Sequence, residues 1–86
     1  MPEISRFLGI VIRMYHNDHL PPHFHAQYAE HDAEITIETL EVLKGSLPRR
    51  VLALAVEWAV LHRAELRQDW ERAQAKQELF RIEPLT

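Results

Sequence analysis

The stretch HFHAQYAEHDAEITIE, residues 23–38, alternates apolar and polar side chains on both sides of a polar segment. A period of two residues is typical of β-strands with one buried face. Phe24, Ala26 and Tyr28 share one face of the first strand, and the second strand repeats the pattern with Ala33, Ile35 and Ile37. We therefore predict an antiparallel hairpin of strands 23–28 and 33–38, joined by a turn over residues 29–32.

The rest of the chain supplies the elements that complete this hairpin into a domain. Further strands are predicted over residues 3–7 and 10–15 and, more briefly, 40–45, with a turn at Gly9 and a loop at Pro21 and Pro22. After Gly45 glycine disappears, and Ser46 is predicted to cap a helix that has Pro48 in its first turn. Apolar residues then recur at helical spacing, and this stripe shifts after His62.

These elements predict an α+β fold in a single domain, residues 1–86. A small antiparallel sheet of four or five strands would carry either one long helix or two consecutive helices on one face. Residues 79–84 would add a short extended segment at the C-terminal end. The helix would cover Ile12, Phe24 and Ile35, because no other segment can bury that apolar face.

The opposite face of the sheet would display polar side chains and two histidines. If Tyr28 pairs with Ala33, His25 lies opposite Thr36 and His23 lies opposite Glu38, about 5 Å apart at Cβ. A carboxylate beside a histidine stabilises its charged form or fixes one tautomer. This arrangement predicts His23, His25 and Glu38 as a candidate catalytic group.

The segment DHLPPHFHAQY, residues 18–28, also has the composition of a metal site. His23 and His25 would lie on one side of a strand, about 6–7 Å apart at Cα. Catalytic zinc often takes three protein ligands, so His19 is a predicted third ligand if the loop folds back, with Asp18 and His16 as further candidates. The residues from His19 to His23 could extend over about 13 Å, so this closure is not automatic. A purely structural role in hydrogen bonding and an acid–base role remain open.

A second polar group surrounds the start of the predicted helix, in the segment KGSLPRR, residues 44–50. Arginines at a helix N-terminus oppose the helix dipole, so their presence calls for a reason. One reason is a bound anion, held by free backbone N–H groups and by Ser46, Arg49, Arg50 and, from the sheet, Arg13. The alternative is ion pairing with Glu38, Glu41 or Glu57.

The composition of the chain argues against tight nucleic-acid binding and against membrane association. Ten Lys and Arg against thirteen Asp and Glu give a net charge of -3, which does not favour nucleic-acid binding, although a local basic patch could still hold phosphate. The chain has no cysteine, no basic-then-apolar leader pattern and no apolar run long enough to span a membrane. We expect a cytoplasmic protein that does not associate with membranes.

The motifs DHLPPHFHAQY and GSLPRR together resemble those of a family of short bacterial and archaeal proteins catalogued as a domain of unknown function. The resemblance covers nearly the whole chain. The positions that match the motifs of the family are Asp18, His19, Pro21, Pro22, His23, His25, Tyr28, Gly45, Ser46, Pro48, Arg49 and Arg50. It implies no activity. It does imply a neighbouring gene for a second small domain, an arrangement similar to toxin–antitoxin pairs.

Three hypotheses follow. The first is a module that binds a small protein partner in such a two-gene system, or a second copy of itself, through the His, Arg and Glu face of the sheet. The second is a small histidine-dependent ribonuclease or a metal-dependent hydrolase, with zinc as the candidate cofactor. A structural zinc ion is a third option.

Overall fold

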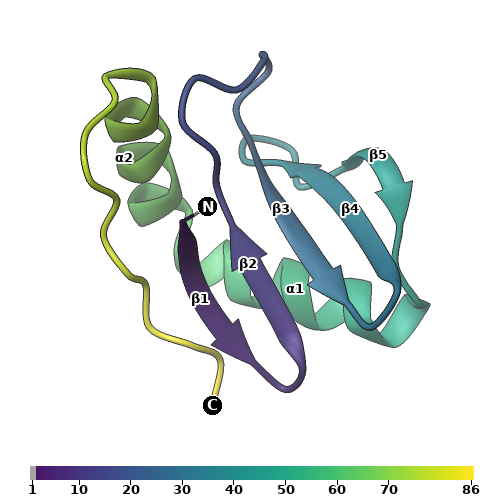
Figure 1. The fold of residues 1–86 in the computed structure, drawn as a ribbon. Helices are drawn as coiled ribbons and strands as arrows, with labels where there is room; N and C mark the ends of the chain where they lie inside the picture. The colour runs from purple at the N-terminus through teal and green to yellow at the C-terminus, as the bar shows by residue number, and fades with distance from the viewer. Residues whose placement is uncertain (1) are drawn as a thin grey trace.

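The computed structural model describes residues 2–86 and contains one five-stranded antiparallel sheet followed by two helices (Figure 1). The strands lie in the sheet in their order along the chain: β1 (Glu3–Phe7), β2 (Ile10–Arg13), β3 (His23–Tyr28), β4 (His31–Thr36) and β5 (Val42–Ser46). The predicted α+β fold is confirmed.

The register of the β3–β4 hairpin differs from the prediction by two residues. Tyr28 pairs with His31 and not with Ala33, so the turn consists of only Ala29 and Glu30. Ala29 adopts a φ of 53°, a left-handed conformation that glycine or asparagine usually occupies in hairpin turns. Neither residue occurs in this segment, so the sequence does not indicate the turn. The two-residue shift leaves each side chain on its predicted face but changes every partner across the strands. His25 therefore lies opposite Glu34.

Two consecutive helices follow the sheet, α1 (Arg49–Leu61) and α2 (Arg63–Gln74), and His62 separates them. α1 crosses one face of the sheet (Figure 1), and Trp58 packs with ring centroids 5.6 Å from Phe7 and 5.9 Å from Phe24. The predicted cap at Ser46 is wrong. Ser46 remains in β5, paired with Asp32, and Pro48 is the residue that precedes the helix. Within residues 2–86, neither helix is long and apolar enough to cross a membrane.

The C-terminal segment, residues 75–86, runs from the end of α2 down beside β1 (Figure 1). Its buried Ile82 donates its backbone N–H to the carbonyl of Ile4 at 2.7 Å. The carboxylate of Asp69 on α2 accepts the backbone N–H of Phe80 at 2.9 Å, and burial raises the pKa of Asp69. This segment covers the outer edge of β1, whereas the outer edge of β5 pairs with no strand among the described residues.

Candidate metal centre

The two strand histidines lie on the face of the sheet opposite Phe24, as pleating requires, but they are not equally accessible. Phe24 is buried with Trp58 on the α1 side. His23, expected on an open face, has no exposed surface, because the β2–β3 loop folds back over it. Its ring lies 4.6 Å from the stacked ring of His19 and 5.3 Å from the ring of Trp70. His25 keeps 23% of its side chain exposed.

The second helix holds the β2–β3 loop in this position. The backbone N–H of Asn17 donates to the carbonyl of Ala73, and the side-chain amide of Gln74 donates to the carbonyl of Asp18, both at 3.3 Å. The peptide bond between Leu20 and Pro21 is cis. The loop closure that the Pro-Pro sequence made uncertain is therefore achieved by contacts with α2.

Both ring nitrogens of His23 face atoms that accept hydrogen bonds. Nδ1 lies 2.7 Å from the carbonyl oxygen of Pro21 and donates its proton to it. Nε2 lies 3.1 Å from Asp18 Oδ2 and 3.7 Å from Glu34 Oε1. A neutral ring protonated at Nδ1 presents a lone pair at Nε2, so three electron-rich atoms then converge. The contact with Asp18 is a hydrogen bond when the ring carries a second proton, and a cation bound at Nε2 is another arrangement that neutralises these atoms.

Two sets of three potential ligands share the Nε2 atom of His23. One set adds Asp18 and His25, and the other adds His19 and Glu34, with the ligand atoms of each set within 4.8 Å of one another. In the second set, Glu34 Oε1 lies 3.3 Å from His19 Nε2 and 3.7 Å from His23 Nε2. Two ligands of a tetrahedral zinc ion are separated by about 3.4 Å, given zinc–ligand bonds of about 2.1 Å. The second set therefore has approximately the dimensions of a zinc site.

Glu34 Oε1 is the atom that distinguishes the two sets. It is buried and has no hydrogen-bond partner. A buried carboxylate oxygen without a partner is costly, and such an atom requires an explanation such as a bound ion. In the first set, by contrast, the 2.9 Å contact between His25 Nε2 and Asp18 Oδ2 is an ordinary hydrogen bond.

The carboxylate of Asp18 is ionised at neutral pH. Burial would raise the pKa of Asp18, but the hydrogen bond from His25 and the backbone N–H of His19 lower it below its ordinary value. The backbone N–H of His19 donates to Oδ1 at 2.8 Å, which leaves Oδ2 directed at the two strand histidines. Asp18 thus places a fixed negative charge beside His23.

The candidate residues are brought together differently from the prediction. His19, His23 and His25 do surround one point, but they divide between the two sets and do not form a single triad. Glu38, predicted to orient His23, instead binds Arg67 on α2 at 2.7 Å, and this guanidinium lowers the pKa of Glu38. Sequence reasoning missed Glu34 because it assumed a four-residue turn. A two-residue turn would have placed Glu34 opposite His25.

The predicted anion-binding residues do not form one site. Arg13 on β2 and Ser46 on β5 are separated by β3 and β4, a distance of about 14 Å at strand spacing. Arg49 and Arg50 are exposed at the start of α1, and within the described chain they form no ion pair with Glu38, Glu41 or Glu57. Of this group, only Arg13 lies near the histidines, opposite His25 on the neighbouring strand.

Comparison with known proteins identifies the family. A family model described as "Domain of unknown function (DUF4160)" matches residues 9–71, which include β2 to β5, α1 and most of α2. The chain therefore belongs to this family. No curated protein and no solved structure shows significant similarity to the chain.

The geometry predicts different effects for two conservative substitutions on neighbouring parts of the chain. In the metal-free protein, Glu34→Gln should move the ring ¹⁵N resonances of His19 and His23, because the carboxylate lies within 3.3 to 3.7 Å of both rings. Glu38→Gln is the matched control and should leave these resonances in place, because its carboxylate binds Arg67. Equal displacement by both variants in ¹H–¹⁵N correlation spectra would contradict the observed register.

Proposed function

We propose that this member of the DUF4160 family is a metal-dependent hydrolase that holds one divalent ion between His19, His23 and Glu34. One observation carries the proposal: His23 Nε2 lies 3.1 Å from Asp18 Oδ2 and 3.7 Å from Glu34 Oε1, and this buried Glu34 oxygen has no hydrogen-bond partner. Two imidazoles and one carboxylate form a ligand set that several catalytic zinc enzymes use. Zinc is accordingly the expected ion.

A metal ion accounts for the surroundings of His23 better than a second proton does. With two protons the ring would be a cation without any exposed surface, and desolvating a charge is expensive even when it is paired. The hydrogen bond from Nδ1 to the carbonyl of Pro21 is also the contact that orients many metal-bound histidines, because it fixes the tautomer with a free Nε2. A second proton would also leave Glu34 Oε1, 3.7 Å away, too distant for a strong hydrogen bond.

The arrangement also supplies the parts of a hydrolytic site. Three protein ligands leave a fourth position for water, and a bound divalent ion lowers the pKa of that water. Asp18 is ionised, lies 3.1 Å from His23 Nε2 and is oriented by His25, so we assign it the role of general base. His19 is 57% exposed, which gives solvent and substrate access from this side.

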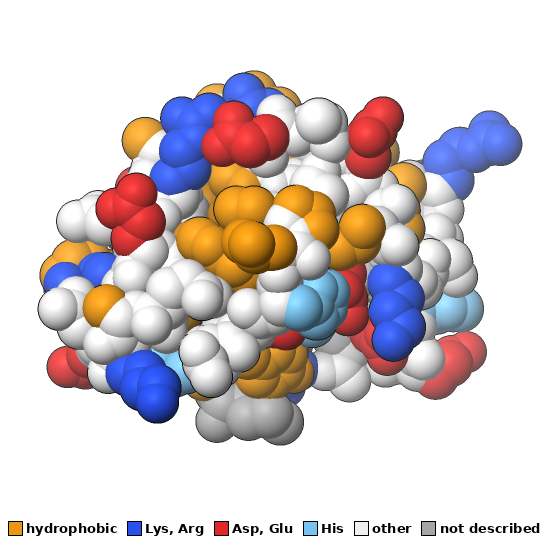
Figure 2. Space-filling view, turned by 90° about the horizontal axis from the view of Figure 1, so that it is seen from above, with side chains coloured by type: hydrophobic (Ala, Val, Ile, Leu, Met, Phe, Trp, Pro, Cys, Tyr) orange, Lys and Arg blue, Asp and Glu red, His pale blue; other side chains and the backbone are white. Residues whose placement is uncertain are grey.

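The surface around this opening is partly apolar. Figure 2 views the end of the molecule that carries the β2–β3 loop and shows apolar side chains gathered next to a histidine. Leu20, adjacent to His19 in the loop, is 75% exposed. An apolar rim of this kind would displace water from a bound substrate and strengthen the electrostatic interactions at the ion.

Protein prepared without a histidine tag should bind one zinc ion per chain. Zinc at about 100 times its dissociation constant should stabilise the fold by about 2.7 kcal/mol, which corresponds to about 10–20 °C in melting temperature for a domain of this size. Glu34→Gln should weaken binding at least about tenfold. Calorimetric titration and thermal melts measure both effects.

The control for the zinc experiment is His31→Ala. His31 lies at the start of β4, beside the hairpin turn and outside both ligand sets, so this variant should bind zinc as the wild type does. A wild type that remains fully folded and takes up no zinc, or a Glu34→Gln variant with wild-type affinity, would overturn the proposal.

Hydrolysis should depend on Asp18 separately from metal binding. With zinc bound, the wild type should cleave an activated ester or phosphodiester, and Asp18→Asn should lower kcat by about 10²- to 10⁴-fold, the usual contribution of a general base. The same variant should lose less zinc affinity than Glu34→Gln, because Asp18 is not one of the proposed ligands. If kcat were unchanged in the variant, the assignment of the base would be wrong.

A different observation supports a second function, binding to a small protein partner in a two-gene system. The outer edge of β5 is unpaired within residues 2–86, and its Val42 and Leu43 are 39% and 42% exposed. An open edge strand can add a strand from another chain through backbone hydrogen bonds. In this proposal the partner is a cytoplasmic protein that supplies such a strand.

The edge-strand proposal is tested with the tagged chain in its native host. Leu43→Glu should abolish recovery of the partner, because it places a charge on the proposed interface. Leu61→Glu is the control, since Leu61 is the same residue type and is even more exposed, at 66%, but lies on α1. Equal recovery of the partner by both variants would count against this second function. A wild-type chain that stays monomeric and recovers no other protein would also count against it.

A further inference from the structure

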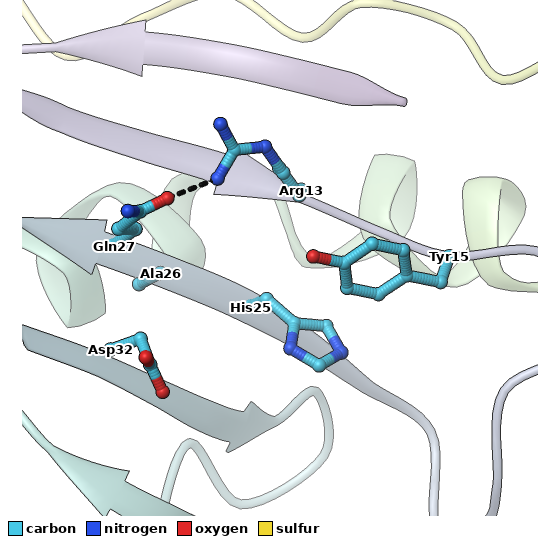
Figure 3. Close-up of a pocket in the computed structure, with 6 residues that line it drawn as sticks. All are labelled: Arg13, Tyr15, His25, Ala26, Gln27 and Asp32. Carbon is cyan, nitrogen blue, oxygen red and sulfur yellow. Dashed lines mark hydrogen bonds between the residues drawn. The ribbon is translucent and has the colours of Figure 1, made fainter. Parts of the chain in front are cut away.

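A pocket opens on the helix-free face of the sheet next to the candidate metal centre. Its volume is about 250 Å³. Its lining comes from three adjacent strands and from Tyr15, two residues after the end of β2: Arg13, Tyr15, His25, Ala26, Gln27 and Asp32 (Figure 3). His25 lies both in this pocket and in one ligand set of the candidate metal centre. Its ring packs edge-on against Tyr15, with centroids 4.5 Å apart, while its Nε2 holds Asp18.

Arg13 is the cation of this pocket, and within the described chain it has no carboxylate partner. Its guanidinium donates to the side-chain carbonyl of Gln27 (Figure 3), a neutral group. Arg6, Arg67 and Arg81, which are more exposed, each pair with a glutamate. Arg13 is half-buried, and a guanidinium has five N–H donors, so several remain for a ligand.

We infer that this pocket binds a singly charged oxyanion of the substrate, a carboxylate or a phosphodiester, on Arg13. The inference rests on the proposed hydrolase function, because it names the substrate class of that site. A guanidinium held in place by Gln27 suits the planar oxygens of either group. Asp32 lines the same pocket, and its negative charge disfavours a doubly charged phosphate monoester.

The position of the pocket also orients the substrate. Arg13 and His25 are paired across β2 and β3, and Glu34 lies opposite His25 on β4. From β2 to β4, the sheet therefore presents the proposed anion site at Arg13, then His25, and then the proposed metal ligand Glu34. A substrate bound by its oxyanion at Arg13 would extend past His25 and present its reacting bond at the proposed ion, while Asp32 would accept a hydrogen bond from an N–H or O–H group of the substrate.

The inference is tested by NMR titration of the zinc-loaded and the metal-free chain with four probes: N-acetylglycine, dimethyl phosphate, inorganic phosphate and the neutral N-acetylglycinamide. N-acetylglycine or dimethyl phosphate should shift the side-chain N–H signals of Arg13 and Gln27. The better of the two should bind about tenfold or more tightly than the neutral amide, since charge-assisted hydrogen bonds are lost with the amide. The preferred probe distinguishes a carboxylate from a phosphodiester substrate.

Variants complete the test. Arg13→Met keeps the aliphatic stem and should weaken binding of the better probe about tenfold or more, Arg13→Lys should restore part of the loss, and Arg49→Met on α1 should have no effect. Zinc affinity should be the same in all three. Equal binding of the anion and the amide, or wild-type binding by Arg13→Met, would overturn the anion site even if zinc binds. Selective anion binding by a chain that takes up no zinc would support the anion site and reject the metal centre.

Discussion

The buried ring of His23 has an acceptor at each nitrogen, and the candidate site depends on this constraint. The carbonyl of Pro21 accepts the proton of Nδ1, which leaves Nε2 directed at Asp18 and Glu34. Buried polar atoms are almost always satisfied in native proteins, and an arrangement of three acceptors is stable only with a positive charge between them. A divalent ion supplies that charge without requiring a buried imidazolium.

The fold positions this ring by combining distant parts of the chain. Strand β3 supplies His23 and His25, the two-residue turn brings Glu34 beside them, and the β2–β3 loop contributes Asp18 and His19. α2 then fixes the loop by the backbone contact at Asn17, and the ring of its Trp70 packs against His23. The packing of α2 is therefore a structural requirement of the site.

Sequence reasoning predicted the fold well, because periodicity follows directly from which face of each element is buried. The strand boundaries of β1 and β3 and the separation of Phe24 from the histidines could be predicted. The shift of the apolar stripe after His62 left one long helix and two consecutive helices both open. The cross-strand partners could not, because the turn at Ala29 and Glu30 lacks a recognisable turn residue. For the same reason the pattern predicts Glu38 in the site, where the structure has Glu34. The closure of the loop over His23 depends on contacts with α2, which local sequence does not encode.

Anomalous diffraction at the zinc absorption edge tests the central claim most directly. Crystals of the untagged chain, grown with zinc, should show a single strong peak about 2.0–2.1 Å from His23 Nε2, with His19 and Glu34 completing the protein ligands. A crystal exposed to zinc that shows no anomalous peak within bonding distance of His23 Nε2 would contradict the account.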